Sequence, residues 1–385
     1  GSEMCIRDSF RKIKSILSIL LISLLIIPLC SGIGIHAKEK NTESNEYKIY
    51  PIPHSVVYDN EQFVMSDRVH VVFEEGIDKA TQNFLEEVIT DYGKTVVHSE
   101  EIVNGETTIL LGIKGSNGKA DSYINKNTTI KTSDLFNRTD SYILSAKENI
   151  ISIVGKDTDS TFFGIATLQM MLTSYEDPAL RSVQIEDFSD IQYRGFIEGF
   201  YGGWDYKSRE SLMRFARDVK MNHYIYASKT DPYHTSKWGE LYPQSEIDQI
   251  QKLVKVGEET KCYYTWSVHI SGFFTNLDTS NETAYNERYQ KLLAKFRQLY
   301  DAGVRKFDIL NDDFGQGTHE DVVNLLNKLT KEFIIPNNCK PITYCMQGYN
   351  KAWSKEAELS ALKKLDKSII LYWTGADVNS PITQE

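Results

Sequence analysis

The stretch Lys306-Phe-Asp-Ile-Leu-Asn-Asp-Asp-Phe-Gly315 decides how this chain is interpreted. It starts with a short apolar run typical of a buried β-strand, and two adjacent acids, Asp312 and Asp313, follow that run. Neighbouring side chains of a strand point to opposite faces, so both acids can share a pocket only where the strand has ended. Two carboxyls in one cleft cannot both ionise freely, which separates an acid from a charge stabiliser. An isolated Asp-Asp pair is equally compatible with a helix N-cap and a solvated turn, so the surrounding pattern must decide.

Short apolar strands, each followed by a longer amphipathic helix, recur on both sides of this stretch. The alternation predicts a (β/α)8 barrel, an α/β fold, over residues 191–385. The expected strands are Gly195–Ile197, His223–Tyr226, Tyr263–Val268, Lys306–Leu310, Ile342–Cys345 and Ile369–Tyr372. The expected helices are Ser208–Lys220, Ser245–Thr260, Glu282–Ala302, His319–Phe333 and Lys355–Leu365. Complete barrels take about 250 residues, so we expect this one to be truncated after about six strands, C-terminally incomplete.

Residues 46–190 show a different pattern, with short strands, Gly and Asn punctuation and two helical stretches. The expected strands are Val69–Phe73, Thr108–Leu111, Tyr142–Leu144 and Ile150–Val154, and the expected helices are Ala80–Tyr92 and Thr161–Tyr175. This combination predicts a small α+β domain before the barrel. It contains no cluster of titratable residues in sequence, so we expect a scaffolding role.

Residues 1–37 read as a targeting segment rather than as part of the fold. Gly1–Ser9 resembles a cloning or assembly scar, and the basic residues Arg11, Lys12 and Lys14 precede an apolar run from Ile16 to Leu29. This order is typical of a secretory signal peptide, so we expect a secreted or cell-surface protein. The run is short for a membrane span, so no stable membrane insertion is expected, with an uncleaved anchor as the alternative.

The bulk composition excludes several classes of function. The 385 residues are 41% hydrophobic and 25% charged, with a net charge of −10, and removing the targeting segment leaves the remainder more acidic still. An acidic surface argues against nucleic-acid binding and gives no general attraction for a polyanion such as hyaluronan. Cys262, Cys339 and Cys345 lack the spacing of a disulfide framework or a zinc site. The histidines at 234, 269 and 319 are scattered, so no metal and no cofactor are expected.

Five motifs lie at the predicted strand ends, where barrels of this kind carry their chemistry. They are Tyr193-Arg-Gly-Phe-Ile-Glu-Gly-Phe-Tyr-Gly-Gly-Trp204, Tyr226-Ala-Ser-Lys229, Asn311-Asp-Asp-Phe-Gly315, Cys345-Met-Gln-Gly-Tyr-Asn-Lys-Ala-Trp353 and Tyr372-Trp-Thr-Gly375. In this order and spacing they resemble glycoside hydrolase family 84, the secreted bacterial β-N-acetylglucosaminidases and hyaluronidase-like enzymes related to the eukaryotic O-GlcNAc hydrolase. The resemblance covers residues 47–385 and is strongest from Arg194 onward.

The resemblance implies retaining hydrolysis assisted by the substrate, in which the 2-acetamido oxygen of the sugar attacks the anomeric carbon. Asp312 would bind the acetamido N–H and stabilise the oxazolinium-like intermediate, and Asp313 would be the general acid and then the base. A direct carboxylate nucleophile would need two carboxyls about 5 to 5.5 Å apart across the scissile bond, which sequence neighbours rarely provide.

Four further residues take roles from the same resemblance. Tyr349 would donate to the acetamido or oxazoline oxygen, Lys229 would hold a sugar hydroxyl, Gly199 would offer a backbone carbonyl where no side chain fits, and Thr374 would line the pocket. Each also has an ordinary structural interpretation: a rim aromatic, a surface lysine, a turn glycine and a loop threonine. Glu198 has no proton-transfer task in the family pattern and is expected to be structural.

The chain departs from the family pattern at three places. Gly202-Gly203-Trp204 lacks the proline that commonly precedes the tryptophan, and Met346-Gln347-Gly348 stands where the family often has Pro-Thr-Glu. The family's Trp-Asp-Asn element and the Asp that follows it, which hold sugar hydroxyls, would lie beyond Glu385.

The resemblance therefore implies a retaining exo-β-N-acetylglucosaminidase acting on terminal β-linked GlcNAc of glycans or glycoproteins, with no cofactor. Endo-acting hyaluronidase activity stays an alternative, as does a catalytically silent carbohydrate-binding adhesin. A family-20-like hexosaminidase is disfavoured because that family pairs Asp with Glu. The natural glycan and the oligomeric state are not specified by the sequence.

Overall fold

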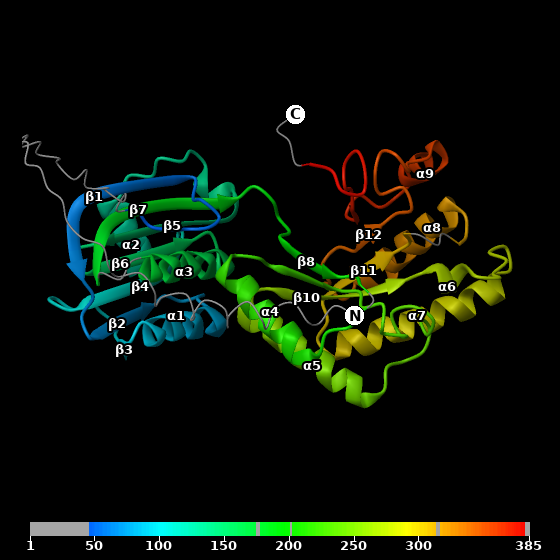
Figure 1. Cartoon of the computed structure of the whole chain (residues 1–385), viewed down its shortest axis with the longest axis horizontal. Coiled ribbons are helices and arrows are strands. Elements are labelled where there is room, and N and C mark those ends of the chain that lie inside the picture. The colour runs from blue at the N-terminus through cyan, green and yellow to red at the C-terminus, as the bar shows by residue number, and fades with distance from the viewer. Residues whose placement is uncertain (1–45, 175–177, 201, 313–315, 382–385) are drawn as a thin grey trace, which may run out of the picture. The chain divides into compact units, whose positions relative to one another are not determined.

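The structure, a computed structural model, describes residues 46–174, 178–200, 202–312 and 316–381. The expected targeting segment and Asp313 lie outside these residues. In the described part of the chain, thirteen strands form two sheets, one of seven strands and one of six (Figure 1). No helix in the described ranges combines the length and the apolar character that a membrane crossing requires.

The seven-stranded sheet belongs to the small domain, which comes first in the chain. Its order is β1-β7-β5-β6-β4-β2-β3, with parallel pairing from β6 to β3 and antiparallel pairing among β1, β7, β5 and β6. The strands are β1 (Ser55–Val64), β2 (Arg68–Phe73), β3 (Thr95–His98), β4 (Thr107–Ile113), β5 (Thr139–Lys147), β6 (Ile150–Gly155) and β7 (Ala179–Ser189).

Three helices pack on this sheet. Helices α1 (Lys79–Asp91) and α3 (Thr158–Thr173) share one apolar core with it, and α2 (Lys119–Asn127) and the 3₁₀ turn η1 (Leu135–Asn137) bury a second, smaller core. The starts of α1 and α3 are fixed by Asp78 and Asp157, whose side chains accept from backbone N–H groups three residues on. Helices α1 and α3 on one hand and α2 with η1 on the other therefore serve separate cores of the sheet.

The six-stranded sheet is parallel throughout and has the order β13-β12-β11-β10-β9-β8. Its strands are β8 (Gly195–Glu198), β9 (His223–Tyr226), β10 (Tyr263–His269), β11 (Lys306–Leu310), β12 (Thr343–Cys345) and β13 (Ile370–Leu371). The intervening helices are α4 (Tyr206–Asp218), α5 (Gln244–Thr260), α6 (Ser271–Phe274), α7 (Glu282–Asp301), α8 (His319–Leu329), the π-helical turn η2 (Thr330–Ile334) and α9 (Glu356–Leu362). This succession is an arc of a (β/α)8 barrel.

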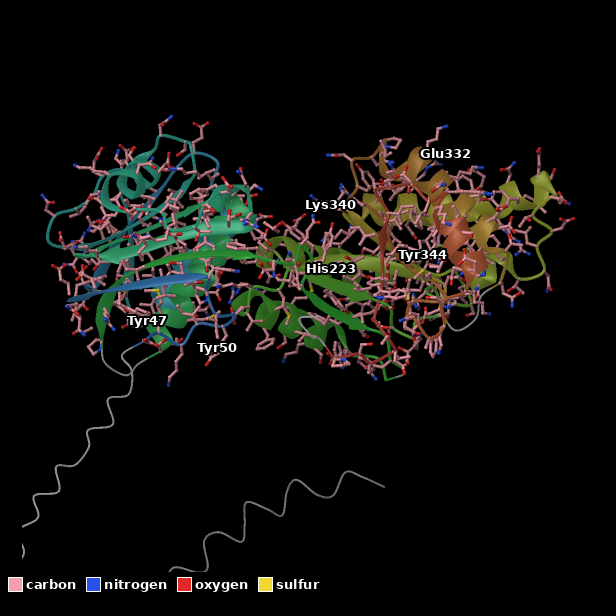
Figure 2. The ribbon with its side chains drawn as sticks, turned by 90° about the horizontal axis from the view of Figure 1, so that it is seen from above. Tyr47, Tyr50, His223, Glu332, Lys340 and Tyr344 are labelled. Atoms are coloured by element: carbon pink, nitrogen blue, oxygen red, sulfur yellow. The ribbon has the colours of Figure 1, made fainter. Side chains whose placement is uncertain are left out.

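The two faces of the six-stranded sheet have separate cores. Helices α4, α5, α7 and α8 cover one face, where Trp266, Phe296 and Phe307 belong to the largest apolar cluster (Figure 1). On the other face, which would line a barrel's interior, Ile225, Ala227 and Leu310 form a small cluster with Cys345 and Tyr372. His223 of β9 and Tyr344 of β12 are labelled in Figure 2 and help to locate this sheet.

The sequence placed the barrel elements well and the small domain less completely. All six expected barrel strands are present, two with their predicted bounds. Helix α8 ends at Leu329 and continues as a π turn, so the prediction of one helix to Phe333 was wrong in its last turn. Strands β1, β3 and β7 and helix α2 were not predicted, because β1 and β3 have few buried residues and β7 carries acids and an arginine.

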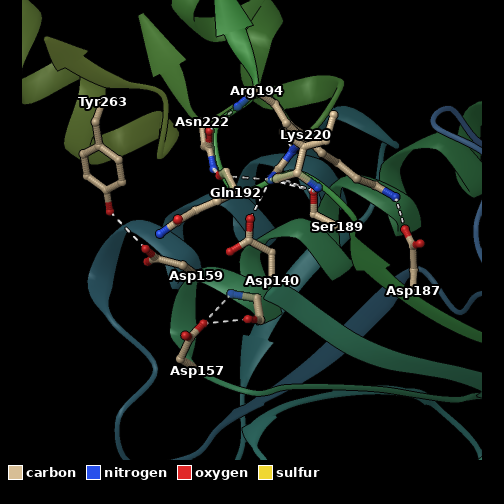
Figure 3. Close-up of polar contacts among 12 residues, drawn as sticks. Asp140, Asp157, Asp159, Asp187, Ser189, Gln192, Arg194, Lys220, Asn222 and Tyr263 are labelled. Atoms are coloured by element: carbon tan, nitrogen blue, oxygen red, sulfur yellow. Dashed lines mark hydrogen bonds and ion pairs between the residues drawn. The ribbon is translucent and has the colours of Figure 1, made fainter. Parts of the chain in front are cut away.

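Ion pairs join residues of the seven-stranded and six-stranded parts within one compact unit. Arg194 pairs with Asp140 at 2.7 Å, Lys220 pairs with Asp187 at 3.0 Å, and the Tyr263 hydroxyl donates to Asp159 at 3.1 Å (Figure 3). Lys220 also reaches the Tyr142 hydroxyl at 2.9 Å. The carboxylates that sequence analysis left without a role in the small domain therefore include anchors for the barrel sheet.

Candidate active site

The carboxyl edge of the parallel sheet brings the sequence motifs together. Because all six strands run in one direction, their ends and the loops that follow lie at one edge. Asp312 comes two residues after β11, Tyr349 four residues after β12, Thr374 three residues after β13, and Lys229 three residues after β9. This shared edge is the candidate active site.

Asp312 lies at the centre of this edge and has an incomplete set of partners. Its side chain is 22% exposed, yet its Oδ1 atom is buried and accepts no hydrogen bond from the described residues. His269 Nε2 lies 3.8 Å from this Oδ1 atom, beyond hydrogen-bond distance. A buried acceptor without a donor is costly, so this oxygen is suited to receive an N–H group from a ligand.

His269 fixes the backbone at Asp312 and was missed as a site residue by sequence reasoning. Its Nε2 lies 2.8 Å from the Asp312 carbonyl oxygen, and its Nδ1 lies 2.9 Å from Ser271 Oγ. The Nε2–H therefore donates to the carbonyl while Ser271 donates to Nδ1, an arrangement that selects one neutral tautomer. The signal available in the sequence was that His269 directly follows the predicted strand Tyr263–Val268, where the loop at the carboxyl end begins.

His234 approaches the same corner but does not complete a metal site. The backbone N–H of His269 donates to the His234 carbonyl at 2.9 Å, and the ring nitrogen Nδ1 of His234 lies 2.9 Å from the Ser267 carbonyl oxygen. Burial lowers the pKa of His234 to about 4, so its ring is neutral near pH 7. No group of three His, Cys, Asp or Glu side chains in the described ranges has the arrangement of metal ligands.

The loops after β12 and β13 are tied to each other. The Thr374 N–H donates to the Tyr349 carbonyl at 2.9 Å, and the Thr374 hydroxyl donates to the Asp377 carbonyl at 2.8 Å. The Tyr349 ring packs edge-on against Trp353 at 5.2 Å between ring centroids. Thr374 thus has a definite role in holding the Tyr349 loop, while its predicted contact with a sugar remains a prediction.

Gly199 and Lys229 lie at the same edge, after β8 and β9. A Cβ atom at Gly199 would meet only Ile197, at 3.8 Å, so the expectation that no side chain could fit there is not met by the described residues. Gly203 is the crowded glycine of this loop, since a Cβ there would lie 2.4 Å from Thr230 Oγ1. Lys229 is partly buried in the turn after β9.

Glu198 is structural, as expected. Its side chain is fully buried, and both carboxylate oxygens accept from Arg209 at 2.8 Å, with Tyr224 donating to one of them at 2.5 Å. Burial alone would raise the pKa of Glu198, but the hydrogen bonds from Arg209 and Tyr224 hold it below its usual value. This carboxylate fastens β8 to α4 on the face of the sheet away from the candidate site.

Comparison with known proteins identifies the family. Residues 194–385 match the family model described as beta-N-acetylglucosaminidase, and residues 46–188 match the model of glycosyl hydrolase family 20, domain 2. The solved structure titled "Structure of CpGH84D" is 37% identical, with a TM-score of 0.81 over 88% of this chain and 57% of its own. "Structure of CpGH84B" is 29% identical, with a TM-score of 0.75 over 87% of this chain and 57% of its own.

The chain belongs to glycoside hydrolase family 84. Its curated relatives include Protein O-GlcNAcase of Rattus norvegicus, 27% identical over 203 residues, which are 48% of this chain and 21% of the relative. Protein O-GlcNAcase of Mus musculus is 29% identical over 120 residues, 31% of this chain and 12% of the relative. This family 84 chain therefore spans about a fifth or less of the matched curated relatives and just over half of the solved structures.

Within this family 84 site, Asp308 is the other residue that sequence reasoning missed. It lies in the middle of β11, four residues before Asp312, and its carboxyl is fully buried. The sequence alone did not indicate a role for this acid inside an apolar run, because the groups near it, from β12 and from the loop after β13, are distant in sequence. Asp312 is thus preceded along the chain by a buried carboxyl on β11.

Proposed function

We propose that the protein containing this chain is a retaining exo-β-N-acetylglucosaminidase that removes terminal β-linked GlcNAc from glycans or glycoproteins. The observation that supports this most directly is the buried Oδ1 of Asp312, an acceptor without a donor at the carboxyl edge of a parallel barrel sheet. The N–H of a 2-acetamido group is a donor of the right kind for it. The family match favours the same substrate class.

The proposed reaction uses the substrate as its own nucleophile. The acetamido oxygen attacks the anomeric carbon as the glycosidic C–O bond breaks, and Asp313 gives its proton to the departing oxygen. Asp312 accepts the acetamido N–H and stabilises the positive charge of the oxazolinium. Asp313 then takes a proton from water, which attacks the anomeric carbon and restores the acetamido group with net retention. An attached nucleophile can have an effective molarity of about 10⁵ M or more, so the protein needs only to orient it.

Other residues at the edge have supporting roles in this proposal. Tyr349 donates to the acetamido or oxazoline oxygen from a loop that Thr374 holds by a 2.9 Å backbone hydrogen bond. Lys229 binds a sugar hydroxyl, and the Gly199 carbonyl accepts from another. We further propose that residues 1–37 direct secretion and that residues 46–190 act as a scaffold.

The test is hydrolysis of an aryl β-N-acetylglucosaminide by the complete gene product, followed by NMR of the first-formed sugar. We expect the β-anomer first, and initial release of the α-anomer would contradict retention. Asp313→Asn should lower turnover about 10² to 10⁴-fold, and less for a good leaving group. Asp301→Asn is the matched control, since Asp301 is an exposed acid at the end of α7.

Two alternative functions predict different results when the same protein is given other substrates. Release of oligosaccharides from the interior of hyaluronan would indicate an endo-acting hyaluronidase. Binding of a GlcNAc-terminated glycan without hydrolysis of any substrate would indicate an adhesin.

A further inference from the structure

The inward face of β11 carries an acid where barrels usually carry apolar side chains. Alternation along the strand places Asp308 on the same face as Leu310, which packs with Ile225 and Ala227. Phe307 and Ile309 point the other way, into the core shared with the helices. Interiors of (β/α)8 barrels are filled mainly by branched apolar residues, so a fully buried carboxyl at this level needs a cause.

The Asp308 carboxyl is only half paired. It lies in register with Ser267 of β10 and Thr343 of β12, and the Thr343 hydroxyl donates to Oδ1 at 2.7 Å. Oδ2 is buried and makes no hydrogen bond with the described residues. The Tyr372 hydroxyl lies close enough to influence the charge of Asp308, but it too makes no hydrogen bond of ordinary geometry there.

The surroundings favour a protonated carboxyl. The pKa of Asp308 is raised to about 7, mainly by burial and also by the negative charge of Asp312, against the opposing effect of the Thr343 and Tyr372 hydroxyls. Burial and the charge of Asp308 raise the pKa of Tyr372, which therefore stays a hydroxyl.

The neighbouring elements supply no compensating cation to Asp308. On β10, Ser267 is level with Asp308 and uncharged, and His269 is one step beyond it towards Asp312. On β12, Thr343 and the Cys345 thiol face the same side, and on β11 itself Lys306 lies one inward position back. No ion pair joins Asp308 to any of the described residues. An ionised Asp308 would therefore be a buried anion with one oxygen unpaired, which is costly.

We propose that Asp308 is a positioning residue for Asp312: in its protonated form it joins β11 to Thr343 of β12 without adding a second negative charge near Asp312. The inference rests on the proposed function, because it assigns the anionic role to Asp312. When Asp308 ionises, its charge and that of Asp312 repel each other, and Asp312 is displaced from the position that orients the acetamido group.

The first experiment compares pH profiles of kcat and KM for the complete gene product and Asp308→Asn. Asn is isosteric, always neutral and able to keep the contact with Thr343. We expect the kcat of the wild type to fall as pH rises through about 7. We expect Asp308→Asn to keep its kcat to a proton concentration about tenfold lower, with KM little changed. Superimposable profiles would overturn the proposal.

Thr343→Val provides a second variant that does not alter the acid. Removing the donor to Oδ1 raises the proton affinity of Asp308, so the alkaline loss of kcat should move to higher pH. A shift to lower pH would contradict the assigned hydrogen bond.

A measurement independent of turnover separates this inference from the proposed function. In protein with ¹³C-labelled aspartate carboxyls, one signal should titrate near pH 7, disappear in Asp308→Asn and titrate at lower pH in Asp312→Asn. If the enzyme hydrolyses no GlcNAc substrate but this signal behaves as stated, the proposed function fails and the coupling of the two acids stands. If the enzyme is active and no such signal exists, the inference fails alone.

Discussion

Two carboxyls, both fully buried, have opposite surroundings in the two sheets. Glu186 of the small domain accepts from the backbone N–H groups of Lys131 and Thr132 at 2.7 Å, one on each oxygen, and from the Gln184 side chain. Asp308 of the barrel sheet accepts one hydrogen bond on one oxygen. Equal burial therefore does not imply an equal role for the two acids.

Other acids follow the same division. Asp187 of the small domain uses one oxygen for His54 and the other for Tyr142 and Lys220. At the carboxyl edge of the barrel sheet, Asp312 keeps a buried oxygen that has no hydrogen bond from the part of the chain that the structure describes. Carboxyls whose oxygens are all paired hold elements together, whereas those with an unpaired oxygen keep capacity for a ligand or a proton.

The largest effect should come from Asp312→Asn, which tests the functional side of this comparison. Loss of the charge that stabilises the oxazolinium should lower kcat about 10² to 10³-fold, even for activated aryl substrates. The free energy of unfolding should not fall, because Oδ1 has no hydrogen bond from the described residues to lose. Steady-state kinetics and urea unfolding of the same preparation check both parts. A large loss of stability with full activity would place Asp312 with the structural acids.

The sequence was sufficient to predict that Asp312 follows the end of a strand, but it did not predict which residues contact this strand and its end. An apolar run with clear boundaries gave β11 with its observed bounds, and the end of a strand is a local property. The partners of that strand end are distant in sequence: His269 is 43 residues before Asp312, and Thr343 is 35 residues after Asp308. Only strand order and register bring such pairs together, and neither is encoded in a local pattern.

The small domain was less predictable for a related reason. The strand β7 contains Arg181, Glu186 and Asp187, polar residues that reduce an apolar signal, yet it lies inside the sheet between β1 and β5. Its acids are acceptable there because loops and lysines far away in sequence pair with them. Tertiary contacts thus override local composition at this strand.

The second effect in size is on the pH dependence of stability, where Asp308 should differ in sign from a well-paired acid. Its folded pKa is raised by burial to about 7, so the unfolded chain ionises first as pH rises, and stability falls between about pH 4 and pH 7. Each tenfold difference in proton affinity is worth about 1.4 kcal/mol. The unfolding free energy of Asp308→Asn minus that of the wild type should therefore be more favourable at pH 8 than at pH 4. Urea unfolding of both proteins at both pH values measures this difference.

Glu198→Gln supplies the comparison for this pH test. Despite burial, the hydrogen bonds of Arg209 and Tyr224 lower the folded pKa of Glu198, so its stabilising contribution is present above the unfolded pKa and is lost as pH falls. Glu198→Gln should be less stable than the wild type near pH 7, and this difference in unfolding free energy should become smaller at acid pH. Equal slopes for the two variants would refute the assigned surroundings.

A smaller effect is expected from Glu186→Gln, which tests the structural side. The amide NH₂ would face a backbone N–H donor, and the loss should be about 1 to 3 kcal/mol of unfolding free energy. The kcat of the folded enzyme should be unchanged. Glu61→Gln is the matched control, since Glu61 forms a half-exposed pair with Lys147 at 3.6 Å, worth about 0 to 1 kcal/mol. Altered kcat in Glu186→Gln would show that the small domain affects the site.

The smallest effect on stability should appear in Tyr372→Phe, for which Tyr142→Phe is the matched hydroxyl deletion. The Tyr142 hydroxyl contacts Thr167, Asp187 and Lys220 at 2.5, 3.0 and 2.9 Å, so its loss should cost about 1.5 to 3 kcal/mol of stability. The Tyr372 hydroxyl makes no hydrogen bond of ordinary geometry within the described ranges, so its loss should change stability by less than about 0.5 kcal/mol. Because that hydroxyl lowers the pKa of Asp308, Tyr372→Phe should still move the alkaline loss of kcat to higher pH. A stability loss in Tyr372→Phe equal to that of Tyr142→Phe would mean that the hydroxyl is paired in solution, and the contrast between the two sheets would then disappear at this position.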